Sequence, residues 1–257
     1  MKKNHKELNS PVLKGQDAPA EVILVDPITL PIAYLLANLK VHPLLITLLA
    51  FIFRIGGGIL FITNGLAIGA IFSIIGFYLD GIDGKIARIR HLDEELHGTI
   101  DFLLDQIAFA FMGIGALGWA IYNDHRLSAL LIGVWLAFYM VLMAFTSTWL
   151  RILSQHGLVY KYGVGKDVFD EAVNVNNKIF INATLLTLKS FFISIRSKLA
   201  RFRMIPYFGA IESEVVIFMI APFFSFNPTL LLISIIFLIP DTLIIVTLSL
   251  LKVIKER

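Results

Sequence analysis

The chain contains no cysteine among its 257 residues. This absence excludes disulfide bonds, thiolate metal sites and a cysteine nucleophile. Charged side chains are also scarce: they make up 16% of the residues, whereas a soluble domain carries about a quarter. The formal net charge of +3 is too small to indicate a nucleic-acid partner. Residues 1–20 lack the apolar core and the small-residue cleavage site of a signal peptide.

Long hydrophobic runs dominate what is present. Hydrophobic residues make up 57% of the chain, and the mean hydropathy is +0.80. We therefore expect an all-α, polytopic membrane protein with six transmembrane helices, at about 42–63, 66–87, 98–122, 127–150, 212–226 and 229–251. Residues 27–40 are apolar but short and contain two prolines, which indicates an amphipathic helix lying at the membrane interface. We expect a polar lead-in at 1–24 and a single membrane domain at 25–257, with an insertion at about 151–203.

The distribution of lysine and arginine predicts the orientation of these spans. The connections at 64–65, 123–126 and 227–228 contain one arginine between them. The opposite set of connections contains Lys85, Arg88, Arg90, the basic 151–203 insertion and a basic C-terminus. The positive-inside rule therefore places both termini and the insertion on the cytoplasmic side.

Four aspartates interrupt two of the most apolar runs at regular intervals. Asp80 and Asp83 lie near the end of the second predicted span, and Asp101 and Asp105 lie near the start of the third. Each would cost roughly 2.5–3.5 kcal/mol at the centre of a membrane helix, so a compensating charge is expected. Spacings of three and four residues put each pair on one helix face, and the intervening turn brings both pairs to similar depth. Four carboxylates without histidine or cysteine suit Mg²⁺, Mn²⁺ or Ca²⁺.

The residues around the aspartates carry a more specific signal. Gly84, Ala87 and Arg88 follow Asp83, and Gly98 precedes Asp101 after a spacer of nine residues. This string resembles the signature of the CDP-alcohol phosphotransferase family (CDP-alcohol phosphatidyltransferases), which reads D-x-x-D-G-x-x-A-R followed by G-x-x-x-D-x-x-x-D. The likeness extends over roughly residues 25–254, and Pro43 to Thr47 is similar to the family's P-N-x-x-T pattern, with Leu44 at the asparagine position.

The resemblance implies an enzyme of phospholipid biosynthesis. A CDP-alcohol, usually CDP-diacylglycerol, would donate its phospho-alcohol group to an acceptor hydroxyl, with release of CMP. Asp80, Asp83, Asp101 and Asp105 would bind Mg²⁺ or Mn²⁺, in two ions, and Asp105 would also be the general base. The resemblance further implies a homodimer. The CDP group would be surrounded by Gly81, Gly84, Ala87, Arg88 and Gly98.

The acceptor half of the reaction has a weaker signal. Arg151, Arg201, Arg203 and Glu212 are candidate acceptor-site residues, although topology alone explains the arginines and a solvated helix end explains Glu212. Arg54, inside the first span, is expected either to bind an anionic substrate group or to neutralise an aspartate. The alternative function is a cation-binding transporter or channel, which would require a polar path across the membrane.

Overall fold

The computed structural model describes residues 12–13, 17–92, 94–155, 199, 202–205 and 207–255, and every regular element within these ranges is a helix. The helix η2 (Glu21–Val25) runs directly into α1 (Asp26–Asn38). Four long helices follow: α2 (Pro43–Ile62), α3 (Leu66–Ile89), α4 (Glu94–Tyr122) and α5 (Arg126–Gln155). The chain ends with α8 (Ala210–Glu214), η4 (Val215–Ile220), η5 (Ala221–Phe224) and α9 (Pro228–Lys255). The prediction of an all-α fold is confirmed.

The boundaries of α2 illustrate how the sequence sets the helix ends. Pro43 occupies the first helical position, where its missing N–H costs nothing. The His42 side chain accepts a hydrogen bond from the amide of Leu44 at 3.3 Å. At the other end Asn64 adopts a left-handed conformation, with φ of 66°, and the Gly65 amide donates to the Leu60 carbonyl at 2.8 Å. A turn of this kind reverses the chain into α3.

Five helices of the described chain are long and apolar enough to cross a membrane. They cover residues 21–38, 43–62, 66–89, 98–122 and 126–144. The six spans predicted from the sequence differ from this set in three ways. The N-terminal helix, predicted to be interfacial, is long and apolar enough to cross a membrane. The predicted fifth span is divided into α8, η4 and η5, and the described apolar part of α9 is shorter, at 228–241. The six-span count and the interfacial helix therefore stay predictions.

The predicted fifth span is irregular because of its sequence. The segment passes from an α-helical turn into a π-helix and then into a 3₁₀-helix that begins around Pro222. Proline has no N–H to donate and its ring blocks a regular helix. Ser225 and Phe226 then take left-handed conformations that turn the chain into α9.

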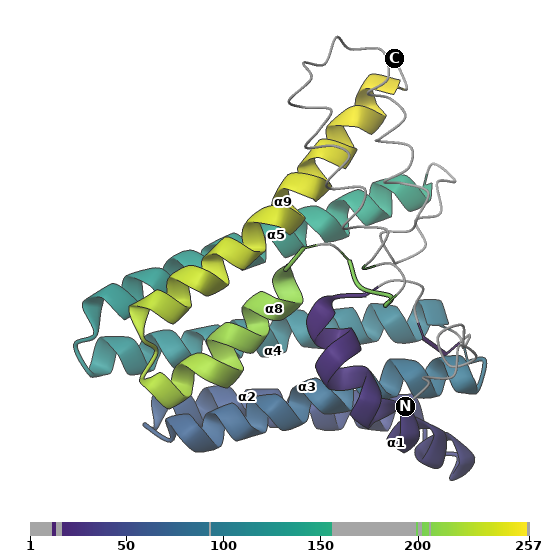
Figure 1. Ribbon diagram of the computed structural model, residues 1–257, viewed down its shortest axis with the longest axis horizontal. Helices are drawn as coiled ribbons and strands as arrows, with labels where there is room; N and C mark the ends of the chain where they lie inside the picture. The colour runs from purple at the N-terminus through teal and green to yellow at the C-terminus, as the bar shows by residue number, and fades with distance from the viewer. Residues whose placement is uncertain are drawn as a thin grey trace.

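The long helices lie side by side, and their connections collect at two opposite ends (Figure 1). The turns at 63–65, 123–125 and 225–227 lie at one end, and the turns at 39–42 and 90–92 lie at the other. The helix formed by η2 and α1 runs obliquely across the second end and packs against α3 (Figure 1). The second end is therefore where the N-terminal helix meets the aspartate-bearing parts of α3 and α4.

Glycines bring α2 very close to both α3 and α4. A Cβ added at Gly57 would lie 3.0 Å from the Gly69 carbonyl oxygen of α3, and one added at Gly115 of α4 would collide with the backbone of Gly58. Small residues allow such close backbone approach between membrane helices. Because α2 is held against both partners, a side chain one turn earlier on α2 can reach α3 and α4 together.

Aromatic side chains fill the core between α4, α5, η4 and α9. Trp135 stacks on Tyr139 with a centroid distance of 4.8 Å, and Phe218 packs edge-on against Trp135 at 5.1 Å. Rings at these separations gain about 0.5–1.5 kcal/mol beyond the area that they bury. This packing fixes the position of η4 relative to α4 and α5.

Candidate active site

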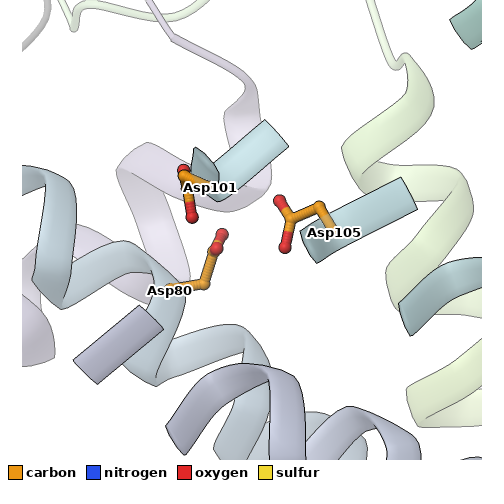
Figure 2. A group of neighbouring side chains, drawn as sticks. All are labelled: Asp80, Asp101 and Asp105. Carbon is orange, nitrogen blue, oxygen red and sulfur yellow. The ribbon is translucent and has the colours of Figure 1, made fainter. Parts of the chain in front are cut away.

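Three of the four aspartates converge at the end of the helix bundle described above. Asp80 comes from α3, and Asp101 and Asp105 come from successive turns of α4. Their side chains point toward one another (Figure 2), and one oxygen of each lies within 4.8 Å of the others. The side chains of Asp80 and Asp105 are 26% and 23% exposed, so that the group is open on one side.

Arg54 of α2 closes the inner side of this group. Its Nη2 lies 3.3 Å from Asp80 Oδ2, and its Nη1 forms an ion pair with Asp105. The guanidinium also lies over the ring of Phe109, with Cζ 4.9 Å from the ring centroid, and the residue is only 2% exposed. Of the two expectations for Arg54, neutralisation of an aspartate is confirmed. One guanidinium can offset only one of the two carboxylates that it contacts.

Asp83 is turned away from the three converging carboxylates and toward α2. Its Oδ2 accepts a hydrogen bond of 2.6 Å from the Thr47 hydroxyl, and its Oδ1 accepts one from the amide of Gly84. Asp83 is 1% exposed, and it remains near enough to Asp80 and Asp101 for the negative charges to repel. The structure thus brings three of the predicted ligands together, and the role of Asp83 as a fourth stays a prediction.

The donor set fits a hard divalent cation. All three converging groups are carboxylates, which are the ligands that Mg²⁺ and Mn²⁺ prefer. Ligand oxygens on opposite sides of one Mg²⁺ lie about 4.2 Å apart, twice the Mg–O distance, so small side-chain shifts from the observed spacing suffice. Asp80, Asp101 and Asp105 are therefore the residues that would hold a metal.

Four of the residues predicted to surround the CDP group lie on α3, and the two glycines among them differ in how closely they are packed. The three described atoms nearest to a Cβ added at Gly84 all belong to Arg88, the first of them at 3.5 Å, whereas a Cβ added at Gly81 would lie 2.5 Å from Val25 of η2. Gly81 is thus packed against the N-terminal helix. Arg88 Nε donates to the Val12 carbonyl at 2.7 Å, and Ala87 is buried.

The position of Gly98 corrects the alignment with the family signature. The signature has a glycine four residues before its third aspartate, but Gly98 lies only three residues before Asp101 and His97 occupies the fourth position. Assigning Gly98 to the signature glycine was therefore wrong by one residue. Gly98 is exposed, and a Cβ there would meet no described atom within 4 Å. Within the described residues, no other helix approaches Gly98 closely.

The candidate acceptor residues do not form a common group in the described chain. Both oxygens of Glu212 accept backbone hydrogen bonds, from Ala20 at 2.9 Å and from Gly209 at 2.8 Å. Arg203 Nη1 lies 2.8 Å from Asp26 Oδ2. Arg201 and the side chain of Arg151 lie outside the described residues. The acceptor assignment of these four residues stays a prediction.

Two buried polar groups near the site have partners that the sequence did not indicate. Glu214 accepts a hydrogen bond of 2.6 Å from the Tyr139 hydroxyl, and its charge attracts that of Arg54. Lys85 is 2% exposed and contacts two carboxylates of the N-terminal helix, Glu21 and Asp26. Only the presence of charges inside apolar stretches could have indicated these groups, because their partners are distant in the sequence.

Comparison with known proteins agrees with this arrangement. A family model described as CDP-alcohol phosphatidyltransferase matches residues 40–239, which is well over half of the chain and includes all four aspartates. No individual curated protein matches the chain.

Proposed function

The chain belongs to the CDP-alcohol phosphatidyltransferase family, and from this premise we propose that it transfers a phosphatidyl group from CDP-diacylglycerol to the hydroxyl of a small polar or phosphorylated alcohol. Membership makes the protein a transferase of phosphate-containing groups in phospholipid synthesis, and the five long apolar helices among its described residues support an integral membrane protein. The observation that carries the proposal is the convergence of Asp80, Asp101 and Asp105 within a stretch that the family model covers.

The proposed reaction breaks a phosphoanhydride bond of the donor and forms a phosphate ester bond to the acceptor. The acceptor oxygen attacks the phosphorus that carries the diacylglycerol, the bond from that phosphorus to CMP breaks, and Asp105 takes the proton of the acceptor hydroxyl. Asp105 suits this role because its carboxylate lies at the open side of the site and its ion pair with Arg54 holds it in place. CMP leaves as the anion with both bonding electrons of the broken bond.

Asp80 and Asp101, with Asp83 beside them, are proposed to hold Mg²⁺ or Mn²⁺, in two ions, together with Asp105. When bound, such cations supply positive charge next to the pyrophosphate of the donor. Gly84, Ala87 and Arg88 are proposed to border the CDP group. Arg88 suits a phosphate because its guanidinium can donate several hydrogen bonds in one plane.

The finer topology is also part of the proposal. We place the active site and both termini on the cytoplasmic side, with η2 and α1 along the membrane surface, which agrees with the oblique course of that helix in Figure 1. The six-span count and the homodimer remain proposals of the same kind. Because the chain has no cysteine, single cysteines introduced at Asn64 and Lys40 can be labelled from one side of a sealed vesicle to check the orientation.

The direct test follows CMP release by purified protein in detergent micelles. The assay contains CDP-diacylglycerol, Mg²⁺ or Mn²⁺ and, in turn, glycerol phosphate, inositol, inositol phosphate and serine. We expect metal-dependent CMP release with at least one acceptor and none after chelation with EDTA. If no acceptor supports CMP release while the protein conducts cations in vesicles, the transporter alternative is correct instead.

Asp105→Asn tests the proton acceptor. Asparagine has the size of aspartate and keeps an oxygen for Arg54, but it does not take up a proton. We expect CMP release to fall by at least about 100-fold, the scale of general-base catalysis, while Mn²⁺ binding falls much less. Asp124→Asn is the matched control, because Asp124 is 79% exposed in the turn at the opposite end. Near-normal activity of Asp105→Asn would show that Asp105 is not the base.

A further inference from the structure

A buried ammonium group lies directly behind the aspartate-bearing turn of α3. Lys85 Nζ lies 3.1 Å from Glu21 Oε1 and 3.0 Å from Asp26 Oδ1, and it donates to the Gly81 carbonyl at 2.8 Å. These three acceptors match the three N–H bonds of an ammonium group. Lys85 is 2% exposed, so the contacts are shielded from water and are correspondingly strong.

Asp26 joins this lysine to a second cation. Its Oδ1 contacts Lys85, and its Oδ2 accepts a hydrogen bond of 2.8 Å from Arg203 Nη1. Asp26 and Arg203 are 7% and 6% exposed. The Asp26 cluster, defined as Glu21, Asp26, Lys85 and Arg203, therefore contains two cations and two carboxylates, of which Asp26, Lys85 and Arg203 are buried and Glu21 is 14% exposed. Removing one charge from such a cluster leaves another buried without compensation.

The Asp26 cluster and the proposed donor site share the same two turns of α3. Gly81 stands between Asp80 and Asp83 in the sequence, and its bare backbone allows Val25 to pack against the turn. Lys85 follows one turn after Gly81 and is tied to its carbonyl. A shift of η2 and α1 would therefore be transmitted to the backbone that carries Asp80 and Asp83.

The segment before η2 extends these contacts to both sides. Asp17 pairs with the backbone that follows Arg203: its amide donates to the Arg203 carbonyl at 2.8 Å, and the Ile205 amide donates to the Asp17 carbonyl at 2.9 Å. Farther toward the N-terminus, the Val12 carbonyl accepts from Arg88. The N-terminal segment thus connects residues 203–205 to Arg88, a residue proposed to border the CDP group.

We propose that Asp26 is a positioning residue for donor binding, which it serves by holding Lys85 and Arg203 and so fixing the N-terminal segment against the signature turn of α3. The inference rests on the proposed function for its kinetic readout. It assigns Arg203 to an internal contact in place of the acceptor phosphate. None of the four members of the Asp26 cluster touches the reacting atoms in this assignment.

The test compares Asp26→Asn with Asp124→Asn in the CMP-release assay. Asp26→Asn should raise the KM for CDP-diacylglycerol about tenfold while kcat and the acceptor KM change by less than about threefold. The reason is that the variant binds the donor more weakly in the ground state and in the transition state by the same amount, which raises KM and leaves kcat unchanged. Asp26→Glu should recover part of the effect, since it restores the carboxylate. Asp124→Asn removes an exposed ion pair with Arg126 and should leave all constants unchanged.

A second readout does not depend on activity. Asp17 and Met204 are paired residues of neighbouring extended segments. Such residues lie about 4.7–4.9 Å apart, which is within the Cα–Cα range of disulfides. The double substitution Asp17→Cys and Met204→Cys should therefore form a disulfide in this cysteine-free chain. Adding Asp26→Asn should slow its formation about tenfold or more, because the segment is no longer held.

Unchanged cross-linking and an unchanged donor KM would overturn the inference. A lower yield of folded protein with an unchanged donor KM would also overturn it, as would a rise in the acceptor KM alone. Absence of CMP release from the unsubstituted protein with the expected cross-linking pattern would instead overturn the proposed function.

Discussion

Gly84 offers the sharpest separation between folding and donor binding. A Cβ at this position would lie 3.5 Å from the nearest described atom, Arg88 Nη1, which is an ordinary van der Waals distance. Alanine is favoured over glycine inside a helix by up to about 1 kcal/mol. Gly84→Ala should therefore leave the free energy of unfolding unchanged or raise it by up to about 1 kcal/mol.

The same methyl group should harm catalysis if Gly84 borders the CDP group. Forcing one extra carbon into a filled site costs about 1–3 kcal/mol, which corresponds to a fall in kcat/KM of roughly 5- to 150-fold. The expected loss lies mainly in the KM for the donor, because the ground state and the transition state both contain the CDP group. Thermal unfolding in detergent and the CMP-release assay measure the two effects on one preparation.

Gly133→Ala is the matched control for this prediction. Gly133 lies in α5, and an added Cβ there meets no described atom within 4 Å. It should have the same small effect on unfolding and none on kcat/KM. Wild-type kcat/KM in Gly84→Ala would refute the placement of the donor beside Gly84, and a lower unfolding temperature would show that the lost activity reflects folding.

Two further substitutions test the polar groups around the aspartates. Arg54→Met should lower the free energy of unfolding by about 2–4 kcal/mol, near the lower end of the range for breaking a buried pair, because Asp80 and Asp105 are each about one quarter exposed. Thermal unfolding measures this, and a loss below about 1 kcal/mol would contradict the ion pairs. Tyr139→Phe should cost about 1–3 kcal/mol because Glu214 loses its buried donor. Tyr122→Phe, at a site that is 85% exposed, should cost nothing, and equal effects of the two changes would contradict the assignment.

Local patterns predicted the helices well because burial in a membrane acts on every residue of a span. The predicted span at 42–63 became α2 at Pro43–Ile62, and the one at 66–87 became α3 at Leu66–Ile89. Helical spacing also predicted that Asp101 and Asp105 share a face, since that depends only on the helix period. Breaks such as the one at Pro222 were harder to predict, because the surrounding packing decides whether a proline bends or ends a helix.

Contacts between distant segments could not be read from periodicity. Asp26 and Arg203 are 177 residues apart, and Lys85 and Glu21 are 64 apart. A basic residue beside the signature is explained equally well by topology, so nothing local distinguished Lys85 from a solvated lysine. The orientation of the Asp83 side chain toward Thr47 also depends on a contact between distant segments. Its spacing placed it beside Asp80, but the rotamer depends on which helix α3 packs against.

Packing on the inner side of the site also bears on the choice between an enzyme and a cation transporter. A transporter needs a polar path that continues beyond the carboxylates. In the described part of the chain, Arg54 lies over Phe109 immediately behind Asp105. One turn deeper, α2 meets α4 through the backbones of Gly58 and Gly115, which leaves no width there for a hydrated ion. A cation that entered from the open side would therefore meet a fixed positive charge, an aromatic ring and closely packed helix backbones in succession. Such a site can hold a cation and a substrate at one membrane face, as a transferase requires, but it opposes passage to the other face.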